Sequence, residues 1–132
     1  MNNMNTIIIG GRKYSEQDVV REKEDYVRLE AVDLCFALYA LVQDESPVVR
    51  AAVARKKVGH EQLVSDDSWR VRATVAKYAD DFQVLDQLLE DENDFVRFVI
   101  VKRGYRLNCL INDKDEEIAS IARYQLQNKK VA

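Results

Sequence analysis

The 132-residue sequence has little proline and little glycine, with one Pro and four Gly. Both residues interrupt helices, so their scarcity favours long helical stretches over a turn-rich β fold. The sequence also lacks a run of about 18 apolar residues, the length needed to cross a bilayer. Before the aliphatic residues Ile7–Ile9 it has no positive residue, which a signal peptide would carry. We therefore expect a cytoplasmic protein with no membrane partner.

Residue types that build catalytic or metal sites are scarce too. His60 is the only histidine, and Cys35 and Cys109 lie far apart without a metal-binding spacing. No phosphate-binding loop, HExxH motif or dinucleotide fingerprint is present. We expect both cysteines to be reduced core residues and His60 to be a surface or capping residue. The sequence predicts no enzyme activity, no metal and no cofactor.

The charge balance limits the class of partner. The formal net charge is −3, with 33% charged and 47% hydrophobic residues. That composition buries a core and stays soluble, which excludes a disordered chain. A negative net charge excludes an electrostatic grip on nucleic acid by the whole molecule, although a local basic stripe stays open.

A recurring pattern organises most of the chain. A leucine, an apolar residue, a polar residue and an aspartate follow one another four times, ending at Asp44, Asp66, Asp91 and Asp113. Six positions after the first three of these stand Arg50, Arg72 and Arg97. Stepping back 22 positions from Asp44 finds Glu22, followed six positions later by Arg28. The chain therefore contains about five units, with Glu22 and Ala119 as the departures at its ends.

Each unit predicts two helical pieces, of which the second is clearer. Apolar residues four apart, such as Val49 and Val53, lie on one helical face. Candidate caps precede these second helices: Ser46 with Pro47, Ser68, and Asn93 or Asp94. One such pair of helices cannot bury its apolar stripe alone, so stacked units must share a core.

This pattern resembles the HEAT repeats, and more closely the shorter leucine-rich repeat variant, over residues 19–126. The resemblance implies an all-α fold, a short right-handed α-solenoid (superhelix) of about five repeats with second helices on its concave face. Residues 1–18 are predicted to form an N-terminal arm and cap, with β propensity at Thr6–Ile9 and a helix cap at Ser15 with Asp18. Residues 127–132 are predicted to be a frayed tail.

The resemblance also implies a ladder between stacked units, in which each Asp pairs with the Arg six positions later. Carried onto this sequence, the pairs are Asp44 with Arg50, Asp66 with Arg72, and Asp91 with Arg97. Glu22 with Arg28 is the weaker first rung, and Asp113 lacks its Arg. A phosphate-binding role for these arginines is the alternative, but the fixed offset to an acid favours a structural one.

A second basic series stands eleven positions after the first three of these Asp, at Arg55, Lys77 and Lys102, with Arg103 beside the last; the fourth Asp has Tyr124 there. If second helices line the concave face, this series forms a basic stripe for an acidic protein surface or a nucleic-acid backbone. A solvated helix face with cations near helix C-termini is the alternative. Phe98 replaces the alanines found at its position in other units, as an exposed partner anchor or as core packing. The predicted partner-binding residues are Arg55, Lys77, Phe98, Lys102 and Arg103.

These features predict a non-enzymatic protein-interaction module, an adaptor, scaffold or inhibitor that binds a protein partner through its concave face. Self-association through the end units stays open. The alternative is a nucleic-acid-binding HEAT-like protein that uses the basic stripe. The resemblance alone also allows a helper subunit of an enzyme.

Overall fold

The computed structural model describes residues 5–131, with side chains described through residue 129. This part of the chain is mostly helical, with nine α-helices, one 3-10 helix and a two-stranded sheet. The N-terminal half contains β1 (Thr6–Ile9), β2 (Arg12–Ser15), α1 (Glu16–Arg21), α2 (Asp25–Asp33), α3 (Leu38–Leu41) and α4 (Pro47–Arg55). The C-terminal half contains α5 (His60–Leu63), α6 (Trp69–Tyr78), α7 (Phe82–Leu88), α8 (Asp94–Lys102), the 3-10 helix Leu107–Cys109 and α9 (Glu116–Val131).

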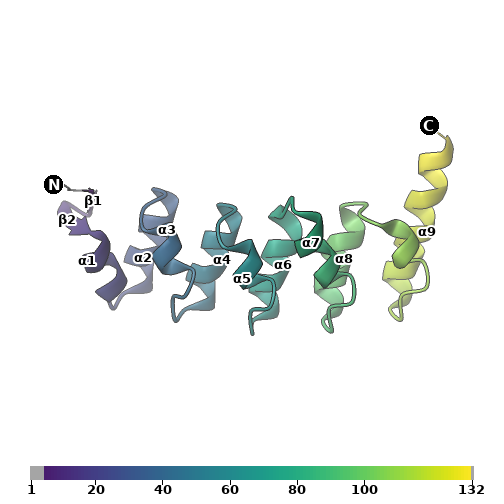
Figure 1. Ribbon diagram of the computed structural model, residues 1–132, viewed down its shortest axis with the longest axis horizontal. Coiled ribbons are helices and arrows are strands. Elements are labelled where there is room, and N and C mark those ends of the chain that lie inside the picture. Colours follow the sequence, from purple (N-terminus) through teal and green to yellow (C-terminus); the bar gives the residue numbers. More distant parts are fainter. Residues whose placement is uncertain (1–4, 132) are drawn as a thin grey trace.

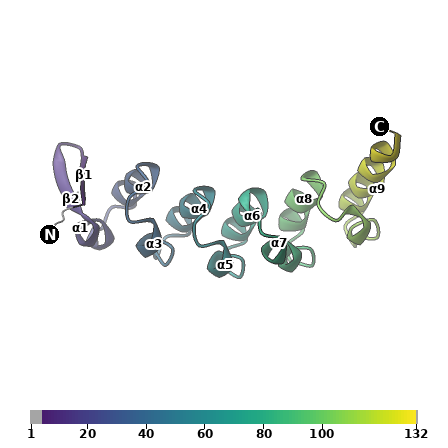
Figure 2. The same ribbon diagram turned by 45° about the horizontal axis from the view of Figure 1, so that its top comes forward.

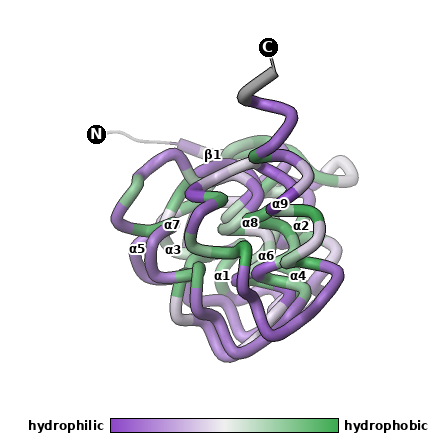
Figure 3. The backbone as a smooth tube through the Cα atoms, turned by 90° about the vertical axis from the view of Figure 1, so that its right-hand side faces the viewer, coloured by the Kyte–Doolittle hydropathy of each residue, from purple (hydrophilic) through white to green (hydrophobic). Residues whose placement is uncertain are grey.

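The helices follow one another along a single row (Figure 1). Helices α2, α4, α6 and α8 lie side by side in one layer, and α1, α3, α5 and α7 form a second layer, below the first in Figure 2. Viewed along the row, α3, α5 and α7 lie on one side and α2, α4, α6 and α8 on the other (Figure 3). The row is slightly curved, with its concave side on the layer of α2, α4, α6 and α8. We call this layer the inner layer and the other the outer layer. Among residues 5–131, no helix combines the length and apolar content required to cross a membrane.

Residues 6–15 form a β-hairpin at the start of the row. Strands β1 and β2 are antiparallel, and Gly10 and Gly11 between them have φ of 57° and 80°, the left-handed values that a two-residue hairpin turn requires. Ile7, Ile9 and Tyr14 pack against the core, and β1 contacts α2. The predicted β propensity at Thr6–Ile9 is therefore confirmed. The predicted cap of the first helix is confirmed as well, since Ser15 and Asp18 bond reciprocally at 2.9 and 3.1 Å.

The second helices start where the sequence predicts, at Pro47, Trp69 and Asp94. Asn93 caps α8 with its own side chain, but Ser46 and Ser68 make no side-chain cap bond. The aspartate two positions earlier accepts their backbone N–H instead, from Ser46 to Asp44 and from Ser68 to Asp66, each at 2.9 Å. These turns therefore depend on the recurring aspartates, whose carboxylates hold the backbone that enters each helix.

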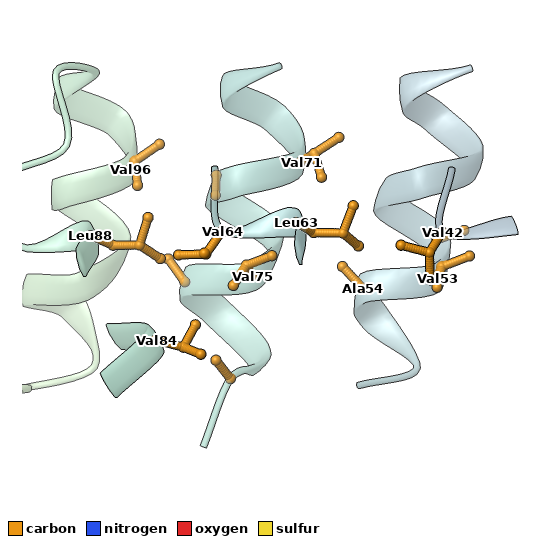
Figure 4. Close-up of a cluster of buried hydrophobic side chains, with 14 of the residues drawn as sticks. Val42, Val53, Ala54, Leu63, Val64, Val71, Val75, Val84, Leu88 and Val96 are labelled. Carbon is orange, nitrogen blue, oxygen red and sulfur yellow. The ribbon is translucent and has the colours of Figure 1, made fainter. Parts of the chain in front are cut away.

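The core lies between the two layers. Residues of the second helices such as Val53, Val71 and Val75 are fully buried, and Leu63 and Leu88 of the outer layer close over them (Figure 4). The buried residues of successive units belong to one hydrophobic cluster, so the row shares one continuous apolar core. Burying such a side chain stabilises the fold by about 1.5–3 kcal/mol.

The turns that leave the second helices repeat a backbone conformation. Two residues, 13 and 15 positions after the acidic residue, have left-handed φ: Cys35 and Ala37, Lys57 and Gly59, Gly104 and Arg106. The prediction that Cys35 and Cys109 are core residues is wrong, because both are exposed. Cys35 lies in this turn since α2 ends at Asp33, although the apolar run Leu34–Leu38 suggests a longer buried segment.

The unit between Asp66 and Asp91 differs from the others. It is three residues longer, and the extra residues lengthen its outer helix, α7, to seven residues where α3 and α5 have four. Ala79 and Asp81, at the positions of the left-handed pair, have negative φ. At the far end, α9 continues through Val131, so the predicted tail is helical as far as the structure describes it.

Candidate functional site

The arginines that follow each acidic residue by six positions form a ladder, with partners that differ from the prediction. Arg28 donates two hydrogen bonds to the carboxylate of Asp44, from Nε at 2.7 Å and Nη2 at 3.1 Å. Its third contact is to the backbone carbonyl of Glu22, at 2.6 Å. The same arrangement recurs from Arg50 to Asp66, Arg72 to Asp91 and Arg97 to Asp113. We call Arg28, Arg50, Arg72 and Arg97 the ladder arginines.

Two predicted details of the ladder are therefore wrong. The carboxylate partner belongs to the next unit, and the acidic residue six positions earlier supplies only its backbone carbonyl. Asp113 does not lack an arginine, since Arg97 pairs with it. In the first unit the ladder uses only the backbone carbonyl of Glu22. The side chain at this position takes no part in the rung, so Glu can replace Asp there.

The ladder is structural because its charged side chains are paired and are buried or nearly so. Side-chain exposure is 4% for Arg97 and 5% for Asp113. Burial raises the pKa of Asp66, but the hydrogen bonds from Arg50 and from the Ser68 backbone outweigh it and hold that pKa below the ordinary 3.8. The pKa of Asp113 is lowered in the same way, with burial opposed by Arg97 and the Asp115 backbone. Each guanidinium directs three of its N–H groups to protein acceptors, which favours a structural role over phosphate binding.

An open groove of about 640 Å³ lies on the inner layer over α6 and α8, with Arg55 of α4 at its edge. All five predicted partner-binding residues line it: Arg55, Lys77, Phe98, Lys102 and Arg103. Arg55, Lys77 and Lys102 come together because each lies eleven positions after an aspartate, near the C-terminal end of one of three neighbouring helices.

Aromatic side chains gather at the opposite end of the groove. Trp69 and Phe95 meet edge to face with ring centroids 5.6 Å apart, and Phe95 stacks on Phe98 at 5.9 Å. Phe98 is half-buried and packs on the core, whereas Phe95 is 47% exposed. Phe98 thus shows both alternatives, since it is part of the packing and part of the groove lining. Phe95 presents the more accessible ring to a partner.

Four cations line the groove together with these rings: Arg55, Arg70, Lys77 and Lys102, which we call the groove cations. Arg70 lies over the Trp69 ring at 4.6 Å, and Lys102 over Phe98 at 5.9 Å. Among the described side chains, none of the four forms an ion pair with a carboxylate. Their charge is therefore available to an incoming ligand.

Arg103 differs from the groove cations, although it lines the same groove. Its Nη1 donates to the backbone carbonyls of Ala76 and Ala79, at 2.8 and 2.7 Å. These carbonyls lie at the C-terminal end of α6, where they have no helical partner. Arg103 therefore ties α8 to α6, and its guanidinium has a structural role.

Acidic side chains border the aromatic end of the groove on its far side. Asp94, Asp115 and Glu117 line a second hollow of about 270 Å³ beside Phe95 and Phe98, toward α9. The charge on the inner layer therefore changes from positive over α4 and α6 to negative near α9, with the aromatic rings between the two regions.

Sequence reasoning missed Arg70, Thr74 and Tyr78, which also line the groove. A signal for Arg70 exists, because it stands four positions after Asp66, in the register that holds Phe95 four after Asp91. His60 begins α5, where its Nε2 lies 2.8 Å from the Ala54 carbonyl oxygen, outside the groove. Among the described residues, no cluster of three or more His, Cys, Asp or Glu side chains is arranged to hold a metal ion.

Comparisons with known proteins give no relative. No protein-family model matches the chain, no curated protein matches its sequence and no solved structure matches its fold.

Proposed function

We propose that this chain is a short right-handed α-solenoid of HEAT-like repeats that acts as a non-enzymatic protein-interaction module. It works as an adaptor, scaffold or inhibitor, and its partner binds across the inner layer. Two exposed free thiols fit the reducing environment of the cytoplasm.

The ladder and the shared core support the repeat architecture. Each rung joins one unit to the next through the same three bonds, and each unit supplies the same buried positions to the core. Extended stacks of this kind present a long surface made by equivalent positions of successive helices, which suits binding to another macromolecule.

The observation that carries the binding proposal is the groove over α6 and α8. It joins an exposed aromatic ring, Phe95, to groove cations without ion-pair partners. Aromatic and arginine side chains contribute most to the energy of protein interfaces, and an open apolar floor with a polar rim is their usual arrangement.

Nucleic acid is the second candidate, because the same rings and cations suit base stacking and phosphate contacts. The acidic border at Asp94, Asp115 and Glu117 counts against it. A strand that follows the row would bring its phosphates onto these carboxylates. We therefore rank the protein partner first.

Photocrosslinking tests the proposal. A benzoylphenylalanine placed at Phe95 should capture a protein in cells, whereas the same group at Phe82 should not. Phe82 is 67% exposed but belongs to α7 in the outer layer, so it controls for non-specific capture. Equal protein capture at both positions, capture of nucleic acid alone, or hydrolase activity of the pure protein would overturn the proposal.

A further inference from the structure

The groove carries information about the chemistry of its partner, and this inference rests on the proposed interaction function. We infer that the groove binds an acidic segment of a partner protein, with carboxylates over α4 and α6 and one apolar anchor side chain on the rings of Phe95 and Phe98. The residue that follows the anchor toward α9 is basic or neutral.

Charge complementarity supports the acidic partner. Arg55, Lys77 and Lys102 stand on three successive inner helices and are exposed. The chain has a net charge of −3, so four unpaired cations around one groove are a local reversal of its overall sign. Oppositely charged patches steer association and select the partner.

The aromatic end supplies the anchor position. The edge-to-face pair of Trp69 and Phe95, with Phe98 stacked beside it, leaves an apolar face at the groove floor. Ala73 and Val99 add apolar surface to the groove lining, and Thr74 and Tyr78 contribute its hydroxyl groups. A ring or a branched aliphatic side chain fits such a floor.

The span sets the length of the segment. Packed helices lie about 8–10 Å apart, so α4 to α8 covers about 20 Å. An extended peptide rises about 3.3 Å per residue, and about six residues cover that distance. The carboxylates of Asp94, Asp115 and Glu117 lie beside the rings on the α9 side, so they contact the peptide residue next to the anchor on that side. The acidic part of the peptide therefore lies on the α4 side of the anchor.

The same acidic border favours a peptide over a nucleic acid. Each phosphate of a strand carries charge, so a strand has no position at which it suits a carboxylate cluster. A peptide changes sign from one residue to the next and matches a groove that does so too.

A peptide selection tests the inference. The full chain is immobilised, and a phage-displayed library of random peptides is selected for binding to it. The peptides are about ten residues long, which is longer than the roughly six residues that the groove spans. The selected peptides should be enriched in Asp and Glu on one side of an apolar residue. Their affinity, measured by fluorescence anisotropy, should fall about tenfold or more for Lys77→Glu with Lys102→Glu.

Matched variants separate the groove from the net charge. Lys13→Glu with Lys23→Glu makes the same charge change at exposed positions away from the groove and should leave binding unchanged. Lys77→Gln with Lys102→Gln gives a second groove variant if the glutamates disturb folding, which circular dichroism monitors. Phe95→Ala should weaken binding about tenfold, and Phe82→Ala should not change it.

The outcomes distinguish this inference from the proposed function. Selection of neutral or basic peptides whose binding Phe95→Ala abolishes would overturn the acidic partner and leave the interaction module in place. No enrichment, or enrichment that no groove variant changes, would overturn both. Salt-dependent binding of a single-stranded oligonucleotide that Lys77→Glu with Lys102→Glu abolishes would assign the groove to nucleic acid. A concentration-dependent dimer that the same variant dissolves in sedimentation would assign it to a second copy of the chain.

Discussion

The ladder arginines and the groove cations occupy the same helices but have opposite surroundings. Arg55, Lys77 and Lys102 each stand five positions after a ladder arginine. Five residues correspond to about 7.5 Å along a helix and about 140° around it. The ladder side chains therefore lie near the start of each helix and are paired, whereas Arg55, Lys77 and Lys102 lie near its end and are unpaired. Two series of residues can recur with the same spacing and still have different roles. The role of each side chain depends on the groups that it contacts.

The largest expected effect comes from breaking one rung. Arg97→Ala leaves the carboxylate of Asp113 buried without its partner, so the free energy of unfolding should fall by about 3–5 kcal/mol. Urea denaturation followed by circular dichroism measures it. Lys102→Ala, five positions later on the same helix, is the matched control. A similar loss of unfolding free energy in both variants would contradict the distinction between the ladder arginines and the groove cations.

The pH dependence of one rung is the next test. The pKa of Asp66 is lowered in the folded chain, so its contribution is present above the unfolded value of 3.8 and is lost as pH falls through the lower folded value. Asp66→Asn should therefore cost about 2 kcal/mol at neutral pH and much less near pH 2.

Urea midpoints of both proteins across this pH range provide the measurement. Asp67→Asn changes the exposed neighbouring carboxylate and should have little effect at any pH. A cost of Asp66→Asn that stayed constant down to acid pH would show that the charge of Asp66 does not stabilise the rung.

Arg103→Ala tests the residue that belongs to the groove by position and to the structure by its bonds. Loss of its contacts to the Ala76 and Ala79 carbonyls should lower the free energy of unfolding by about 1 kcal/mol. Binding of the selected acidic peptides should change less than twofold. A large loss of binding with no loss of stability would place Arg103 among the groove cations.

The smallest effect on stability is expected from the groove cations themselves. Lys77→Ala and Lys102→Ala remove exposed side chains without ion-pair partners, so each should change the free energy of unfolding by no more than about 0.5 kcal/mol. Thermal denaturation of both variants checks this. A loss of unfolding free energy above about 2 kcal/mol would indicate a structural role that the observed contacts of these side chains do not explain.

Much of the helical fold and of the candidate site follows from the sequence. The register located the starts of α4, α6 and α8, and it singled out Arg55, Lys77 and Lys102, which the groove brings together. It could not determine the partner of each ladder arginine. Spacing along a chain places Asp44 and Asp66 at opposite ends of one unit, but only the packing of adjacent units decides which carboxylate Arg50 reaches.

The exposed cysteines show another limit of sequence reasoning. The run Leu34–Leu38 is apolar throughout, which is typical of a buried segment, but it forms a turn with left-handed φ at Cys35 and Ala37, and Cys35 is exposed there. Non-glycine residues seldom adopt that conformation, so composition gives no sign of it. The glycines Gly59 and Gly104 in the corresponding turns are the signal that an internal comparison of the units would use.

The position of the ladder has a mechanical consequence. Its four links join neighbouring units near the turns that enter the inner helices, where each guanidinium holds a carbonyl of one unit and a carboxylate of the next. Each link therefore resists separation of two neighbouring units at this edge of the row. At the opposite ends of the inner helices Arg103 supplies a further tie, from α8 to the carbonyls of Ala76 and Ala79 at the end of α6. The two halves of the groove wall are thus fastened at both ends of their helices, so a ligand meets a groove that is already held in shape.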